Sequence, residues 1–258
     1  MADTLTIAVI SDIHYAGEAE RKRGGTELEV VRNPLLKAGV FLFRRFVWLK
    51  DPTAQNHMLD RAIEAAKGAD FVVANGDYSC DTAFVGVSDD AAFESAEICL
   101  TRLRKAFGDR LLITMGDHEI GKMSIFGGVG GPRLESWERV RHDLEIEPLW
   151  TRQLGSYLLV GAASPVVAFP AYEPEAKPEE RPIWWRIRDN YMRELSALFS
   201  SLHPKQRVIL FCHDPTALPF LHDQKAIRER IHQIETTVVG HLHTPMIYGA
   251  SRLLAGMP

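Results

Sequence analysis

Short apolar runs, several of which end in acidic or histidine residues, recur along the chain and constrain its fold more than any other feature. Their continuous apolar character predicts strands that are buried on both faces. Helical patterns separate the early runs, and this alternation predicts an α/β protein with parallel pairing in at least its first half. The runs cover residues 4–10, 71–74, 111–115, 157–160, 208–212 and 236–239.

Two helices are expected between the first three runs. Asp51 and Pro52 predict the start of one helix, and Gly68 predicts its end. Its inner face is expected to contain Met58, Leu59, Ala62, Ile63 and Ala66. The second helix has an inner face of Phe93, Ala96, Leu100, Leu103 and Phe107, and it ends at Gly108. The proline-rich and charged segment 165–182 predicts a long surface loop.

Composition limits the classes of protein that this chain can belong to. Its 258 residues, 46% hydrophobic and 25% charged, suit a single domain over 1–258. The net charge of −4 argues against duplex nucleic acid as a partner. The chain has only three cysteines, which suits a reducing compartment. It shows no basic leader before an apolar stretch and no run of about 18 consecutive apolar residues. These features favour a cytoplasmic protein. Attachment to the inner face of a membrane stays open.

The chemically active residue types follow the predicted strands. In open α/β sheets, ligands bind outside the carboxyl ends of the strands, so five strand ends would bring three carboxylates and five imidazoles to one rim. Carboxylate and imidazole donors suit Mn²⁺, Fe or Zn²⁺, and their number exceeds what one tetrahedral ion needs. We therefore expect two ions that share a bridging ligand. The residues are Asp12, His14, Asp77, Asp117, His118, His213, His241 and His243.

Each of these motifs is common by itself, and the ordered series carries the argument. A purely structural explanation would have to account for so many ionisable groups at the end of a buried sheet, where uncompensated charges are costly. The motifs are Asp12-Ile-His14, Gly76-Asp77, Gly116-Asp117-His118-Glu119, His213 and Gly240-His241-Leu242-His243. In this order they resemble the calcineurin-like metallophosphoesterase family over nearly the whole chain.

The resemblance implies a four-layer αββα fold, in which a two-sheet β-sandwich is flanked by helices and has a dinuclear site at its edge. It assigns Asp12, His14 and His243 to one ion, and His213, His241 and Asp117 to the other. Asp77 would bridge the two ions, of which manganese is the first choice and iron or zinc the alternatives. His118 would be the general acid, oriented by Glu119 or Asp81.

Residue 117 departs from the family pattern, which has asparagine at this position. A third carboxylate beside Asp12 and Asp77 lowers the formal charge of the centre from +1 to neutral, counting two divalent ions and a hydroxide. The centre would then attract phosphate less strongly or favour harder cations. In an alternative arrangement, Asp117 turns away from the metals and holds His118. A further departure follows His243, after which only residues 244–258 remain.

The expected activity is hydrolysis of a phosphoester, in which a metal-bridging hydroxide attacks phosphorus and His118 protonates the leaving oxygen. A small-molecule phosphoester is the first choice of substrate, and both monoesters and diesters remain open. The alternatives are a peripheral membrane enzyme that acts on a lipid-linked pyrophosphate or diester, a nuclease, and an inactive interaction scaffold. The sequence assigns no substrate-binding residue, although Lys122 and Arg133, in and just after the glycine-rich segment 121–131, are candidates for phosphate contact.

Segment 15–50 is an insertion between the first metal motif and the first long helix, and connections of this length are usually functional. Its second part, PLLKAGVFLFRRFVWLK, predicts a short helix that combines apolar and basic residues. Lys37, Phe41, Arg44 and Trp48 share one stripe of that helix, so its polar face is mixed. Two interpretations stay open: a cap or dimer-interface helix, or a helix over 35–50 that lies on a membrane surface.

Overall fold

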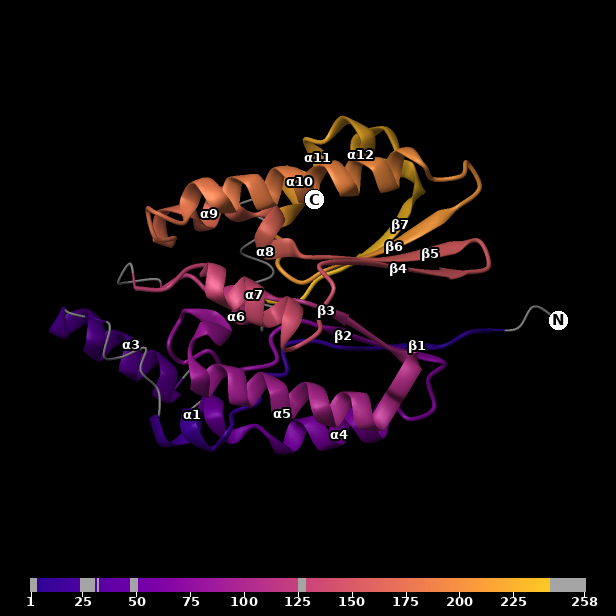
Figure 1. Cartoon of the computed structure of the whole chain (residues 1–258). Coiled ribbons are helices and arrows are strands. Elements are labelled where there is room, and N and C mark those ends of the chain that lie inside the picture. Colours follow the sequence, from indigo (N-terminus) through magenta and orange to yellow (C-terminus); the bar gives the residue numbers. More distant parts are fainter. Residues whose placement is uncertain (1–3, 24–30, 32, 47–50, 125–128, 242–258) are drawn as a thin grey trace.

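Two stacked β-sheets lie between two layers of helices (Figure 1). The structure, a computed structural model, describes residues 4–23, 31, 33–46, 51–124 and 129–241. One sheet has the strand order β1-β2-β3 and the other has the order β4-β5-β6-β7. The expected αββα arrangement is therefore confirmed.

The first sheet consists of β1 (Ile7–Ile10), β2 (Phe71–Asn75) and β3 (Leu111–Thr114), and all its pairs are parallel. Parallel neighbours require long crossovers, which here contain α4 (His57–Ala66) and α5 (Asp90–Phe107). Both helices lie on the outer face of this sheet (Figure 1). The carboxyl ends of all three strands consequently meet at one edge.

The second sheet begins with β4 (Leu149–Leu154), which pairs antiparallel with β5 (Tyr157–Ala162). β6 (Arg207–Cys212) and β7 (Ile234–Val238) continue the sheet in parallel. Its outer face is covered by α8 (Ser164–Val167), α10 (Arg181–Ser200), α11 (Ala217–His222) and α12 (Lys225–Glu229) (Figure 1).

Alternation along the strands divides the core between the layers. Val73, Leu159 and Phe211 form a small buried cluster between the sheets, whereas their neighbours Val72 and Val160 belong to the larger core beneath the helices. In the part of the chain that the structure describes, the remaining α-helices are α1 (Glu18–Arg23), α3 (Pro34–Phe46), α6 (Asp117–Ile120), α7 (Leu134–His142) and α9 (Phe169–Tyr172).

The helix expected from Pro52 to Gly68 is interrupted. Asp51 caps only a 3-10 helix over Pro52–Ala54, where its side chain accepts a hydrogen bond from Thr53 N at 2.9 Å. The Asn56 side chain instead binds the backbone of Ala16, donating to its carbonyl at 2.7 Å and accepting from its N–H at 2.8 Å. α4 starts after this contact, and Met58 is half exposed instead of buried.

The prediction of a surface loop over 165–182 was wrong. The segment contains α9 and most of α8, it leads into α10, and Val166, Val167 and Phe169 are fully buried. Pro165, Pro170 and Pro182 do not prevent this, because they stand at the first or second position of α8, α9 and α10, where the missing N–H needs no partner.

Candidate metal centre

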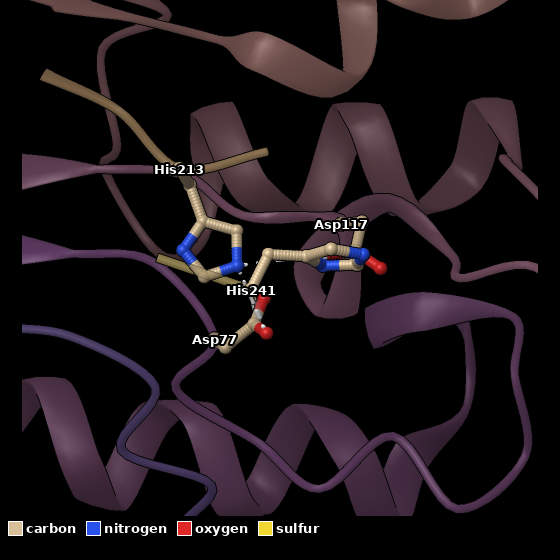
Figure 2. Close-up of side chains that lie close together, drawn as sticks. All are labelled: Asp77, Asp117, His213 and His241. Carbon is tan, nitrogen blue, oxygen red and sulfur yellow. Dashed lines mark hydrogen bonds and ion pairs between the residues drawn. The ribbon is translucent and has the colours of Figure 1, made fainter. Parts of the chain in front are cut away.

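Four side chains from two sheets converge at the carboxyl ends of the strands (Figure 2). Asp77 follows β2, Asp117 follows β3, His213 follows β6 and His241 follows β7. His213 Nε2 lies 3.0 Å from Asp77 Oδ2 and 3.6 Å from Asp117 Oδ1. His241 Nδ1 lies 3.0 Å from Asp117 Oδ1. One ligand atom from each residue lies within 4.8 Å of the others, which is a separation that a single ion can span.

A second group shares Asp77 with the first. His14 Nε2 and His118 Nε2 lie 3.9 Å and 3.7 Å from Asp77 Oδ2. The three residues again offer atoms within 4.8 Å of one another. Asp77 therefore stands at the junction of two sets of potential metal ligands.

Carbonyl groups determine which nitrogen of two histidines faces the cluster. His213 Nδ1 lies 2.6 Å from the Asn75 carbonyl oxygen, and His118 Nδ1 lies 3.0 Å from that of Ser79. A carbonyl oxygen only accepts, so Nδ1 carries the proton in both rings. Nε2 is then the atom that faces Asp77 and that would offer its lone pair to a metal, which is the usual arrangement of a metal-binding histidine.

The buried polar atoms of the cluster fit a cation. Asp77 and His213 are fully buried. Among the described residues, neither Asp77 Oδ2 nor His213 Nε2 makes a hydrogen bond, although both atoms lie within 4 Å of charged or titratable neighbours. Unsatisfied groups in this position are costly, and a bound metal removes that cost. The two groups together offer two carboxylates and four imidazoles, a donor set suited to transition metals.

The backbone at the site adopts a conformation that is rare outside glycine. Asp12, His14, Asp77 and His241 have φ angles of 55°, 46°, 60° and 68°. Left-handed backbone costs about 1–3 kcal/mol per residue and persists where the surroundings enforce it. Its concentration at four potential ligands marks this edge as functional.

Glycine precedes three of the potential ligands because the space beside them is filled. A Cβ on Gly76, where φ is +87°, would lie 2.6 Å from His213 Nδ1. A Cβ on Gly116 would overlap Asp77 Oδ1, and one on Gly240 would lie 2.7 Å from Asp12 Oδ2. The Gly-Asp and Gly-His pairs of the sequence are thus required by packing.

A model of the calcineurin-like phosphoesterase family matches residues 5–245. The chain belongs to this family. A calcineurin-like phosphoesterase hydrolyses phosphoester bonds with the help of divalent metal ions, and the buried Asp/His cluster could bind them. Among solved structures, the phosphopantetheinyl hydrolase of Mycobacterium tuberculosis matches at 15% identity and a TM-score of 0.41, over 93% of this chain and 83% of that one. A search of curated proteins found no match.

Opposite charges shift the pKa values in this phosphoesterase. Burial alone would raise the pKa of Asp77, but His118 and His213 hold it below its ordinary value. Burial alone would lower the pKa of His241, but Asp117 raises it to about 9. Burial lowers the pKa of His118 well below its ordinary value, against the opposing effect of Asp77. Asp77 is therefore ionised at neutral pH, and a metal ion that binds here must displace the proton of His241.

The remaining predicted ligands stand in different relations to the cluster. Asp12 Oδ1 accepts a hydrogen bond from His241 N at 2.7 Å, which places Asp12 beside the first group of ligands. His243 lies outside the described residues. Asp117 is buried, with its carboxylate facing His213 and His241, so it does not turn away from the other predicted ligands in this phosphoesterase.

Glu119 has a role that the sequence did not indicate. Its buried carboxylate accepts hydrogen bonds from Tyr78 N and Gly116 N, both at 2.7 Å, and from Asp77 N at 3.1 Å. It therefore joins the loops that carry Asp77 and Asp117, and it is not the orienting partner of His118. Asp81 does not orient His118 either, because it accepts from Val85 N and Gly86 N while the Ser79 carbonyl holds the ring.

The two candidates for phosphate contact differ in their surroundings. Arg133 donates to the carbonyls of Gly131, Pro132 and Glu175, which indicates a structural role. Lys122 Nζ donates to the Cys80 carbonyl at 3.0 Å. Burial is the main cause of the lowered pKa of His118, Asp77 opposes that effect, and the positive charge of Lys122 lowers the pKa further.

A further buried pair adjoins the ligands. Tyr172 Oη donates to Asp214 Oδ2 at 2.7 Å, and Asp214 directly follows His213. Tyr172 belonged to the segment that was expected to be a loop, so no sequence signal pointed to it.

Proposed function

We propose that this phosphoesterase hydrolyses a small-molecule phosphoester at a dinuclear centre in which Asp77 bridges the two ions. The observation that carries the proposal is the position of Asp77 Oδ2, which lies within 4 Å of His14, His118 and His213. One carboxylate oxygen can serve two ions only from such a junction.

The remaining ligands divide between two ion positions. His213, His241 and Asp117 would hold one ion, and His14, Asp12 and His243 would hold the other. Manganese is the first choice, and iron or zinc are alternatives. When bound, the ions supply positive charge for the phosphoryl oxygens and lower the pKa of a coordinated water.

His118 is proposed as the group that delivers a proton to the leaving oxygen. Its Nδ1–H is occupied by the Ser79 carbonyl, so Nε2 is the atom that would carry the transferable proton. Burial keeps the ring neutral in the resting enzyme. The negative charge of an incoming phosphoester opposes this effect and favours protonation of Nε2.

Metal analysis and hydrolysis of bis-p-nitrophenyl phosphate test the proposal together. The native chain, stripped and reloaded with Mn²⁺, Fe²⁺ or Zn²⁺, should bind two ions per chain and hydrolyse the diester. Asp77→Asn should lose both ions and reduce activity by at least about 100-fold, because the bridge supports both positions.

Asp109→Asn is the matched control, because Asp109 is exposed in a 3-10 helix at the other end of β3. It should retain two ions and full activity. Retention of two ions in Asp77→Asn would exclude the bridging role, and one ion in the native chain would exclude a dinuclear centre.

A second candidate function is the hydrolysis of a lipid-linked pyrophosphate or diester at the same centre. The observation that favours it is the exposure of large apolar side chains on α3, in the insertion that follows the first metal motif. Comparing water-soluble diesters with a lipid-linked pyrophosphate in detergent micelles would separate the two candidates by kcat/KM.

A further inference from the structure

α3 presents large apolar side chains to solvent. Leu35 is 83% exposed, Phe46 is 77% exposed and Leu42 is 52% exposed. At 100° per residue these three positions fall within an arc of about 40°, so they form one line along the helix. Figure 1 shows α3 at the left edge of the molecule, projecting beyond α1 and α6. The line therefore points away from the core of this chain.

Local signals explain why the helix starts, but they do not explain its apolar face. The Asn33 side chain accepts hydrogen bonds from Leu35 N at 2.9 Å and Leu36 N at 3.2 Å, and Pro34 occupies the first helical position. A helix of 13 residues is only marginally stable in water without packing on its apolar face. A surface outside the described residues would supply that packing.

The charge of the segment indicates what that surface is. Residues 34–50 contain four basic residues and no acidic residue, whereas the whole chain has a net charge of −4. The rest of the chain therefore carries −8, and basic character is concentrated at the apolar helix. Lys37 is exposed and lies nearly opposite Phe46 on the helix.

We propose that α3 docks on an anionic lipid bilayer, with Leu35, Leu42 and Phe46 inserted among the acyl chains and Lys37 near the headgroups. Apolar insertion and attraction of cations to anionic lipid are the two contributions that hold an amphipathic helix in the plane of a membrane. Among the described residues no helix has the length and apolar character that spanning a bilayer requires. The inference does not depend on the number of metal ions in the active centre.

A second copy of the chain is the competing occupant. A symmetric contact through α3 would bring two basic segments together, and repulsion between them opposes association. Anionic lipid reverses the sign of that interaction. The charge distribution thus favours the bilayer over self-association.

Flotation of the full chain with vesicles tests the inference. Vesicles of phosphatidylcholine with 30% phosphatidylglycerol should bind the chain, and vesicles of phosphatidylcholine alone should bind it at least about tenfold more weakly. Binding should fall as salt is raised, because screening weakens the attraction of basic residues to the headgroups.

Substitutions in α3 connect binding to this helix. Leu35→Asp with Phe46→Asp should reduce the bound fraction at least about tenfold, and Lys37→Gln about fivefold. Ile231→Asp is the matched control, because Ile231 is 48% exposed, close to the 52% of Leu42, but lies in the 3-10 helix before β7. Circular dichroism and thermal unfolding would verify that each variant folds.

Three results would overturn the inference. The first is that the chain does not bind anionic vesicles, and the second is that Ile231→Asp loses as much binding as the α3 variants. The third is that light scattering shows a dimer of the native chain that becomes a monomer in Leu35→Asp with Phe46→Asp. The last result would assign the apolar line to self-association.

Discussion

At the scale of single residues, the cluster combines an unusual backbone with an unusual charge. Asp77 and His241 hold left-handed φ angles, and each is preceded by a glycine that leaves room for its neighbours. Asp117 adds a buried carboxylate beside His213 and His241. The first feature fixes where the ligand atoms lie, and the second determines how strongly the centre attracts cations and anions.

Asp117→Asn should shift the balance between metal and substrate binding. Removing one negative charge from the ligand set weakens attraction for the cations and strengthens it for an anionic phosphoester. We expect the metal dissociation constant to rise and KM for bis-p-nitrophenyl phosphate to fall, each by about threefold to tenfold. Titration of stripped protein with Mn²⁺ and steady-state kinetics measure the two effects, and opposite signs would contradict the charge argument.

His118→Ala should separate substrates by the basicity of their leaving group. A poor leaving group, such as an alkoxide, needs a proton, so its kcat should fall by about 100-fold or more. p-Nitrophenolate leaves without help, so its kcat should change little. Parallel kcat measurements on an alkyl and a p-nitrophenyl ester provide the test. Equal losses on both esters would exclude His118 as the acid.

At the scale of secondary-structure elements, the ordinary core was predictable and the special contacts were not. β2 and β3 follow from continuous apolar runs, and the Asp and His residues after them identify the edge of the sheet at which a site should lie. β4 escaped prediction because Thr151, Arg152 and Gln153 are exposed on an edge strand, where little apolar pattern is required.

Contacts across the fold set the limit of sequence reasoning at the site. The role of Glu119 depends on three backbone N–H groups from two loops, and no pattern in the sequence encodes that convergence. The orientation of His118 by the Ser79 carbonyl is equally invisible, since every residue has a carbonyl. The helices within residues 165–182 could not be predicted, because a proline at a helix start looks the same in the sequence as the proline of a loop.

α10 offers a prediction in which two adjacent tryptophans differ. Trp184 is 1% exposed and lies between Phe169, at a ring distance of 5.8 Å, and Trp137, at 6.0 Å. Trp184→Ala should lower the free energy of unfolding by about 3–5 kcal/mol through lost burial and a cavity. Trp185 is partly exposed, so Trp185→Ala should lower the free energy of unfolding by less than half as much. Urea unfolding of both variants checks the difference, and equal losses would contradict it.

At the scale of the whole molecule, the centre joins the two sheets. Asp77 and Asp117 extend from the first sheet, whereas His213 and His241 extend from the second. The sheets also share the small apolar cluster of Val73, Leu159 and Phe211. Metal binding should therefore stabilise the contact between the two halves of the fold.

Removing the metal should lower the melting temperature. At a free metal concentration 100 times the dissociation constant, binding contributes about 2.7 kcal/mol, which corresponds to about 5–10 °C for a chain of this size. Calorimetry with and without a chelator measures the shift. In Asp77→Asn the chelator should have little effect, and an unchanged shift in that variant would show that the metal stabilises the chain elsewhere.

The filled spaces beside Gly76, Gly116 and Gly240 have a consequence for how this enzyme can be redesigned. Even a single added methyl group at any of the three would displace a potential ligand, whereas residue 117 accommodates a carboxylate beside His241. The affinity and metal preference of the centre can be tuned by exchanging donor atoms, but the glycines in the loops that space those atoms have to be kept.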